Sequence, residues 1–231
     1  MSSQHDNIDN STSAASMEYA GVLTGDIVDS QKIDASQHQA VLTRLRQTLA
    51  SFYDTLSLVD FDVYRGDAFQ ALFAKPADAI KAAMLLRLLM RNAEPTCEVR
   101  QSVGIGAIGS LSDAIKRANG EAFTLSGRGL DSLRHGYLSV HAQDAALQQQ
   151  LGLLTRFVDA RLSDLPTMQS RVLLAYLQQP DATHDDLAKH LGKARSTITR
   201  SLNSANYQLF EDYLAYVDKC FNQQRQGGAR R

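Results

Sequence analysis

The chain has 231 residues, a length that suits one large domain or two small ones. Its composition is 44% hydrophobic and 21% charged, as in a globular protein, and no apolar run approaches the roughly 18 residues that cross a membrane. Two cysteines, Cys97 and Cys220, exclude a disulfide framework, and no Cys and His cluster has zinc-site spacing. The first residues lack the basic start and apolar stretch of a signal peptide, so we expect a cytoplasmic protein without a membrane partner.

The net charge of −1 hides a difference between the two ends of the chain. Residues 151–231 contain 11 Lys and Arg against 8 Asp and Glu, whereas residues 1–150 contain 13 against 17. This modest basic bias at the C-terminal end is compatible with a polyanionic partner.

Residues 17–142 alternate between strand and helix patterns, after a polar segment, 1–16, that we expect to be a disordered tail. The order predicts an α+β domain with a mixed sheet. The predicted strands are Tyr19–Ile27, Phe61–Tyr64, Phe69–Phe73, Cys97–Gly106 and Tyr137–Val140, and the predicted helices are His38–Leu56, Pro76–Met90, Ser112–Asn119 and Glu121–Leu133.

The strand patterns stop after Ala142. A long helical pattern, Asp144–Arg161, predicts a linking helix over residues 143–163. Residues 164–221 then hold three helical patterns, Thr167–Leu177, Thr183–Leu191 and Arg195–Phe221, the last of which could be broken. The polar end, residues 222–231, predicts a second disordered tail.

Two aspartates stand where strands of the predicted sheet end. Asp26 follows the first strand in TGDIVDS, and Asp67 lies in the hairpin of VYRGDAFQALF. If the two strands are neighbours, both carboxylates meet at one sheet edge, where a hard divalent cation relieves their repulsion. The alternative is that Asp26 caps a turn and Asp67 merely forms the hairpin, and spacing alone favours that alternative.

Four motifs in order, GDIVDS, RGDAFQALF, SVGIGAIG and GEAFTLSGRGLDSL, resemble the class III nucleotidyl cyclase domain and, within it, the divergent SatD family. The resemblance covers roughly residues 19–140. It implies a ferredoxin-like sheet, a head-to-tail homodimer, and a nucleoside triphosphate bound with Mg²⁺ or Mn²⁺ in the dimer cleft. The implied metal ligands are Asp26 and Asp67, helped by the carbonyl of Ile27, and Gly66 belongs to the nucleotide-binding hairpin.

The sequence departs from the cyclase pattern at two positions. Arg128 matches the arginine that stabilises the transition-state phosphate, but Thr124 stands where cyclases have a catalytic Asn, and Val63 stands where they have the purine-binding Lys. A guanidinium can clamp a phosphate in bidentate fashion, so nucleotide binding stays a hypothesis while cyclisation is in doubt. The sequence G-x-G-x-x-G at Gly104–Gly109 matches a dinucleotide fingerprint, but we interpret it as close backbone packing.

The segment Thr183–Asn203, THDDLAKHLGKARSTITRSLN, has the pattern of two helices joined by a short turn at Gly192. With the preceding helix it resembles the trihelical helix-turn-helix of MarR-type and sigma-type regulators. Cations, hydroxyls and amides occupy the face opposite the apolar one, which suits contacts with phosphates and base edges. The candidate DNA-binding residues are Lys193, Arg195, Ser196, Thr197, Thr199, Arg200 and Asn203. A three-helix bundle that docks another protein is the alternative.

These features predict a dimeric transcriptional regulator that binds DNA and responds to a nucleotide through a degenerate cyclase-like domain. The rival hypothesis is an active metal-dependent nucleotidyl cyclase, or a related phosphoryl-transfer enzyme, with a fused helix-turn-helix. A third is a structural module whose cleft binds nothing. An aromatic stripe in residues 204–221 predicts a packing or dimerisation surface.

Overall fold

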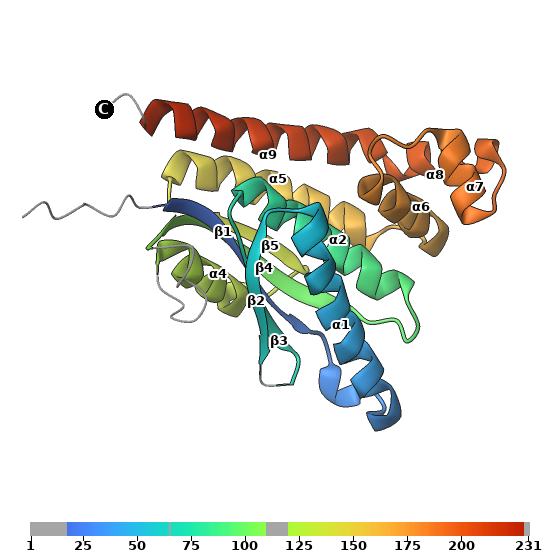
Figure 1. Ribbon diagram of the computed structural model, residues 1–231, viewed down its shortest axis with the longest axis horizontal. Helices are drawn as coiled ribbons and strands as arrows, with labels where there is room; N and C mark the ends of the chain where they lie inside the picture. Colours follow the sequence, from blue (N-terminus) through green and yellow to red (C-terminus); the bar gives the residue numbers. More distant parts are fainter. Residues whose placement is uncertain (1–17, 65, 110–119, 229–231) are drawn as a thin grey trace, which may run out of the picture.

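The computed structural model describes residues 18–64, 66–109 and 120–228 (Figure 1). The expected N-terminal tail, residues 1–16, and the expected helix Ser112–Asn119 lie outside the described residues. Within them, the chain forms an α+β structure in which one mixed sheet is followed by a run of helices. No helix of the described part is both long enough and apolar enough to cross a bilayer.

Five strands form a single sheet in the order β2-β3-β1-β4-β5. Strand β1 is central and pairs antiparallel with β3 on one side and β4 on the other, while β5 runs parallel to β4. The bounds are β1 Glu18–Ile27, β2 Leu58–Tyr64, β3 Ala68–Phe73, β4 Val99–Ile108 and β5 Leu138–Ala142. All five predicted strands are therefore present, with bounds that differ by up to three residues.

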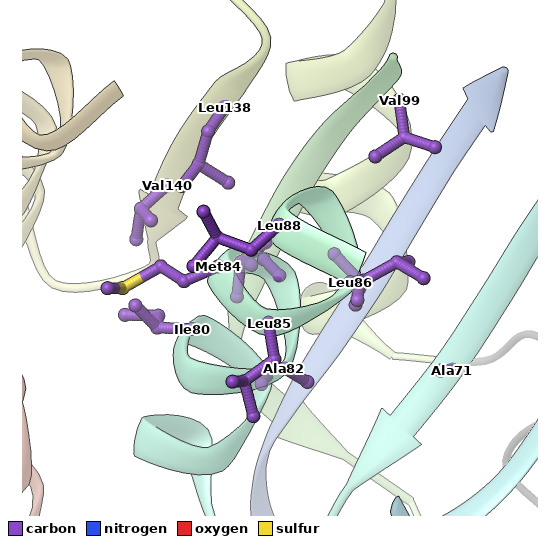
Figure 2. Close-up of a cluster of buried hydrophobic side chains, with 14 of the residues drawn as sticks. Ala71, Ile80, Ala82, Met84, Leu85, Leu86, Leu88, Val99, Leu138 and Val140 are labelled. Atoms are coloured by element: carbon purple, nitrogen blue, oxygen red, sulfur yellow. The ribbon is translucent and has the colours of Figure 1, made fainter. Parts of the chain in front are cut away.

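Helices cover both faces of the sheet (Figure 1). Helices α1 (Ala35–Thr55) and α2 (Pro76–Asn92) lie on one face, and α4 (Glu121–Ser132) packs on β4 and β1 from the other. Alternate side chains of β1 divide between the two faces, so Leu23 belongs to the large core with α2 and Val22 to a smaller one with α4. Figure 2 shows Met84 and Leu88 of α2 close to Val140 of β5 within the large core.

Helix α4 approaches β4 unusually closely because β4 carries glycine at the contact. A Cβ on Gly104 would lie 2.1 Å from the carbonyl oxygen of Ala122 and 2.4 Å from the backbone nitrogen of Ser126. The interpretation of the G-x-G-x-x-G sequence as a site of close backbone packing is confirmed for Gly104. Because Gly104 has no side chain, the α4 backbone can pack directly against the sheet.

The C-terminal helices are α5 (Ala145–Ser163), α6 (Thr167–Gln178), α7 (His184–Leu191), α8 (Arg195–Ala205) and α9 (Tyr207–Gly228). Helices α6 and α9 pack on α2, and Phe210 and Val217 of α9 belong to the same core as the sheet. Leu151 and Leu162 of the expected linking helix are also buried in that core. The sheet and the helical end therefore share one hydrophobic core in this structure, with α5 as part of it.

The break that the sequence left open within the long pattern Arg195–Phe221 occurs at Asn206, which adopts a left-handed conformation (φ 57°) and separates α8 from α9. Asparagine tolerates this conformation better than most residues, because its side chain is short and polar. Helix α9 then continues to Gly228, into the segment for which the sequence predicts a tail.

Candidate functional site

The two candidate metal ligands lie at the same end of the sheet. The last residue pair between β1 and β3 is Gly25 with Phe69, Asp26 follows on β1, and Asp67 precedes β3 in the hairpin. The antiparallel pairing of these neighbouring strands thus brings two residues that are far apart in sequence to one sheet edge. Their side chains, however, have different surroundings.

Asp26 forms a bidentate ion pair with Arg100, which stands opposite it on β4. The distances from Nε and one terminal nitrogen of Arg100 to the two carboxylate oxygens are 3.2 and 2.6 Å. The hydrogen bonds that Arg100 donates to the Asp26 carboxylate raise the pKa of the Arg100 guanidinium. Sequence reasoning missed Arg100, and only the β1–β4 register could have identified it as the partner of Asp26.

Asp67 lines a hollow of about 450 Å³ between the hairpin and the start of α1. Ser30, Gln31, His38 and Gly66 share this lining, and the short 3-10 helix η1 (Ser30–Lys32) supplies the first two. Among the described residues, Asp67 has no hydrogen-bond or ion-pair partner. The two carboxylates therefore differ within the described residues: Asp67 lines the hollow without such a partner, whereas Asp26 is paired with Arg100.

A metal held by both aspartates would have to compete with Arg100 for Asp26. Both oxygens of Asp26 accept hydrogen bonds from Arg100, so the guanidinium already compensates the negative charge that a cation would bind. The described residues contain no group of three or more His, Cys, Asp or Glu side chains that could hold a metal. Ile27, whose carbonyl the resemblance assigns to the metal, lies at the end of the β1 ladder, paired with Val99.

Helix α4 presents Thr124 and Arg128, four residues apart, on its exposed side. Its opposite side is anchored to the sheet, because the buried Ser126 hydroxyl hydrogen-bonds to the Thr24 hydroxyl of β1 at 2.8 Å. Neither Thr124 nor Arg128 lines the hollow at Asp67. Within one chain, the structure therefore does not combine the expected catalytic pair with that hollow.

The second candidate site is built on α7 and α8. Thr183 caps α7 through a capping box with Asp186, and this pairing lowers the pKa of the Asp186 carboxyl. Gly192 ends α7 in a left-handed conformation (φ 61°), and only three residues separate α7 from α8. A small core under both helices, including Val172 of α6, Leu187 and Ile198, fixes the angle between them.

The outer face of α8 forms a hollow that is lined by polar and cationic side chains. Its volume is about 580 Å³, and the lining residues are Arg195, Ser196, Thr199, Arg200, Asn203 and Ser204. The structure thus brings together five of the seven candidate DNA-binding residues, and the other two, Lys193 and Thr197, are exposed beside them. The pattern LAKHLGKARSTITR predicts the same face.

Two contacts from α7 reach this face and do not follow from the sequence pattern. Asp185 lies 3.6 Å from Arg195, although both side chains are more than half exposed. His184 Nδ1 lies 2.9 Å from the hydroxyl of Thr199. An exposed ion pair of this kind contributes little energy, so Arg195 can still exchange Asp185 for a phosphate.

The sequence was compared with models of protein families and with curated proteins. Neither comparison found a match.

Proposed function

We propose that this protein is a DNA-binding regulator in which α8 enters the major groove. The observation that supports this function is the hollow on α8, where Arg195, Arg200 and Asn203 converge without any acidic residue of α8 itself. Guanidinium groups bind phosphates and guanine edges, and the Asn amide matches adenine. The three-residue connection between α7 and α8 supports the proposal, because helix-turn-helix motifs join their two helices by a turn of three or four residues.

DNA binding can be tested without knowledge of the target sequence, because phosphate contacts produce salt-dependent affinity for any duplex. We expect a labelled random-sequence duplex to raise fluorescence anisotropy with an affinity that falls as salt increases. In the Arg200→Ala variant, the slope of log K against log salt should shrink by about 0.9 for a single lost phosphate contact.

Arg156→Ala, at an exposed position of α5, is the matched control and should behave as the wild-type protein. An unchanged affinity and salt slope in Arg195→Ala and Arg200→Ala would show that α8 does not face DNA. Strong binding of a protein partner with no binding of DNA would favour the alternative of a docking bundle.

For the sheet, we propose a degenerate cyclase-like sensor of a nucleotide. Two observations support this part of the proposal. The antiparallel order β2-β3-β1-β4, with helices α1 and α2 as crossovers, has the split βαβ pattern of ferredoxin-like folds. The open carboxylate of Asp67 also lines a hollow beside η1.

In this sensor, Arg100 decides whether a metal can take part. While Arg100 pairs with Asp26, nucleotide binding has to depend on Asp67, η1 and, from a partner chain, Arg128. Arg100→Ala removes the competing cation, and we expect the variant to gain affinity for Mn²⁺. A metal affinity that does not change in this variant would show that Asp26 is no part of the site.

Thermal shift with each ribonucleoside triphosphate, with and without Mg²⁺ or Mn²⁺, tests the sensor directly. Asp67→Asn is the control, and it should abolish any rise in melting temperature. Mass spectrometry of the same mixtures would detect a cyclic product. Turnover that disappears in Asp67→Asn would favour the active enzyme over the sensor, and no shift with any nucleotide would favour a structural module.

A further inference from the structure

The packing of α8 fixes which of its side chains point away from the protein. Ile198 and Leu202 are fully buried in the small core that α8 shares with α6 and α7. Successive residues of an α-helix are turned by about 100°, so Ser196, Arg200 and Asn203 lie about 140–160° around the axis from Ile198. All three are exposed and line the hollow on α8. They follow one another in steps of four and three residues and form one stripe along the outermost side of the helix.

Arg195 and Thr199 line the same hollow, but they lie on the flank of α8 that faces α7. Helical geometry turns them by only about 60° and 100° from Ile198. Asp185 of α7 lies 3.6 Å from Arg195, and Nδ1 of His184 lies 2.9 Å from the Thr199 hydroxyl. The hollow is therefore divided into a flank that contacts α7 and the outermost stripe.

Arg200 and Asn203 of the outermost stripe have side chains that suit base edges. Neither side chain has a hydrogen-bond or ion-pair partner within the described part of the chain. Side chains on the outermost side of a helix point at the floor of a groove that the helix enters, whereas those on its flanks point at the phosphates. A guanidinium matches O6 and N7 of guanine in bidentate fashion, and a carboxamide matches N6 and N7 of adenine.

We infer that the DNA site of this protein contains a guanine and an adenine in successive base pairs, with Arg200 reading the guanine and Asn203 the adenine. This inference rests on the proposed DNA binding and assigns its sequence preference. Three residues of an α-helix rise about 4.5 Å, close to the separation of about 3.4 Å between base pairs. Side chains three residues apart on a recognition helix read successive bases in zinc fingers, which use the same spacing.

Arg195 has a different part in this arrangement. On the flank beside Asp185, its guanidinium contacts a phosphate, and phosphate contacts carry no sequence information. Arg200 also binds a phosphate on a duplex that lacks the matching guanine, because nonspecific affinity comes from the phosphate backbone. The base preference of the protein therefore distinguishes Arg200 and Asn203 from Arg195.

Selection of bound duplexes from a random-sequence library, followed by sequencing, tests the inference with the full chain. We expect the wild-type protein to select sites in which a G·C pair stands next to an A·T pair. Changing either pair should weaken binding by roughly 5- to 150-fold, the discrimination that a bidentate contact provides. In Asn203→Ala the preference for adenine should disappear while that for guanine remains, and Arg200→Ala should show the reverse.

Arg195→Ala is the matched control, because it removes a guanidinium from the same hollow but from the flank. It should weaken binding of all duplexes alike, reduce the slope of log K against log salt by about 0.9, and leave the base preference intact. Asn203→Ala should leave the salt slope unchanged, since the amide carries no charge. Far-UV circular dichroism checks that each variant is folded.

Base preferences that are the same in the wild-type protein and in folded Asn203→Ala and Arg200→Ala would overturn the inference. Salt-dependent binding without any base preference would overturn it as well. Both outcomes leave the proposed function in place, because the protein would still bind DNA. Absence of binding to any duplex would instead refute the proposed function, and the inference with it.

Discussion

The close contact between α4 and β4 leads to a sharp prediction about Gly104. In Gly104→Ala the new Cβ would lie 2.1 Å from the Ala122 carbonyl oxygen and 3.0 Å from Ser126 Cα, whereas ordinary contact begins at 3.4 Å. All these neighbours are backbone atoms, so no side-chain rotation relieves the overlap. Helix α4 has to move away from the sheet by roughly 1 Å, and overpacking of this kind typically costs about 1–3 kcal/mol.

The same displacement weakens the buried hydrogen bond between Thr24 and Ser126, which adds about 1 kcal/mol. We therefore expect Gly104→Ala to lower the free energy of unfolding by about 2–4 kcal/mol, measured by urea denaturation followed by circular dichroism. Gly127→Ala is the matched control, because nothing lies within 4 Å of its added Cβ. In a helix this change should stabilise by about 0.5–1 kcal/mol. A Gly104→Ala protein as stable as the wild type would refute the close packing of α4.

Three further predictions concern charge and burial. Arg87 is fully buried between Glu98 and Asp159. Arg87→Met leaves Asp159 buried without its cation, so the free energy of unfolding, measured by urea denaturation, should fall by about 3–5 kcal/mol. A decrease of less than about 1 kcal/mol would contradict this prediction. The capping box lowers the pKa of Asp186 in the folded protein below 3.8, the ordinary aspartate value that the unfolded chain retains. The capping box therefore contributes its full stabilisation above pH 3.8. This stabilisation is lost as the pH falls through the lower pKa of the folded state. The difference in melting temperature between the wild-type protein and Asp186→Asn should therefore shrink in acid, and a difference independent of pH would argue against the cap. Burial raises the pKa of Cys97 to about 11, so a thiol reagent at pH 8 should modify Cys220 in the folded protein and reach Cys97 only after denaturation, as counted by mass spectrometry.

Local signals were enough to predict the elements of the helical end. The cap at Thr183, the left-handed glycine at Gly192 and the apolar positions Leu187, Ile198 and Leu202 act within one or two turns of helix. Their spacing therefore predicted α7, the turn and α8, as well as the polar face that α8 exposes. The candidate DNA-binding residues could be named from the sequence because exposure on a helix follows from its period.

The aromatic stripe of α9 shows what helical periodicity does not predict. It correctly indicated an apolar face, but a stripe of Phe210, Tyr213 and Val217 does not say what covers that face. In the structure the stripe packs into the core shared with α2. The exposed apolar surface is instead formed by Leu209 of α9 and Phe157 of α5. The packing of the two helices against each other determines which side of each helix stays exposed to solvent.

The amino-acid sequence predicts features that depend on neighbours a few residues away. These features are the kinds of element, the apolar face of most helices and the position of Asp26 and Asp67 at strand ends. The pairing of Asp26 with Arg100, 74 residues along the chain, and the separate hollow at Asp67 emerge only in the folded chain. Strand register follows from the packing of the whole sheet, and a shift of one residue would turn each side chain to the opposite face. The chemistry of the sheet edge therefore could not be derived from motif spacing alone.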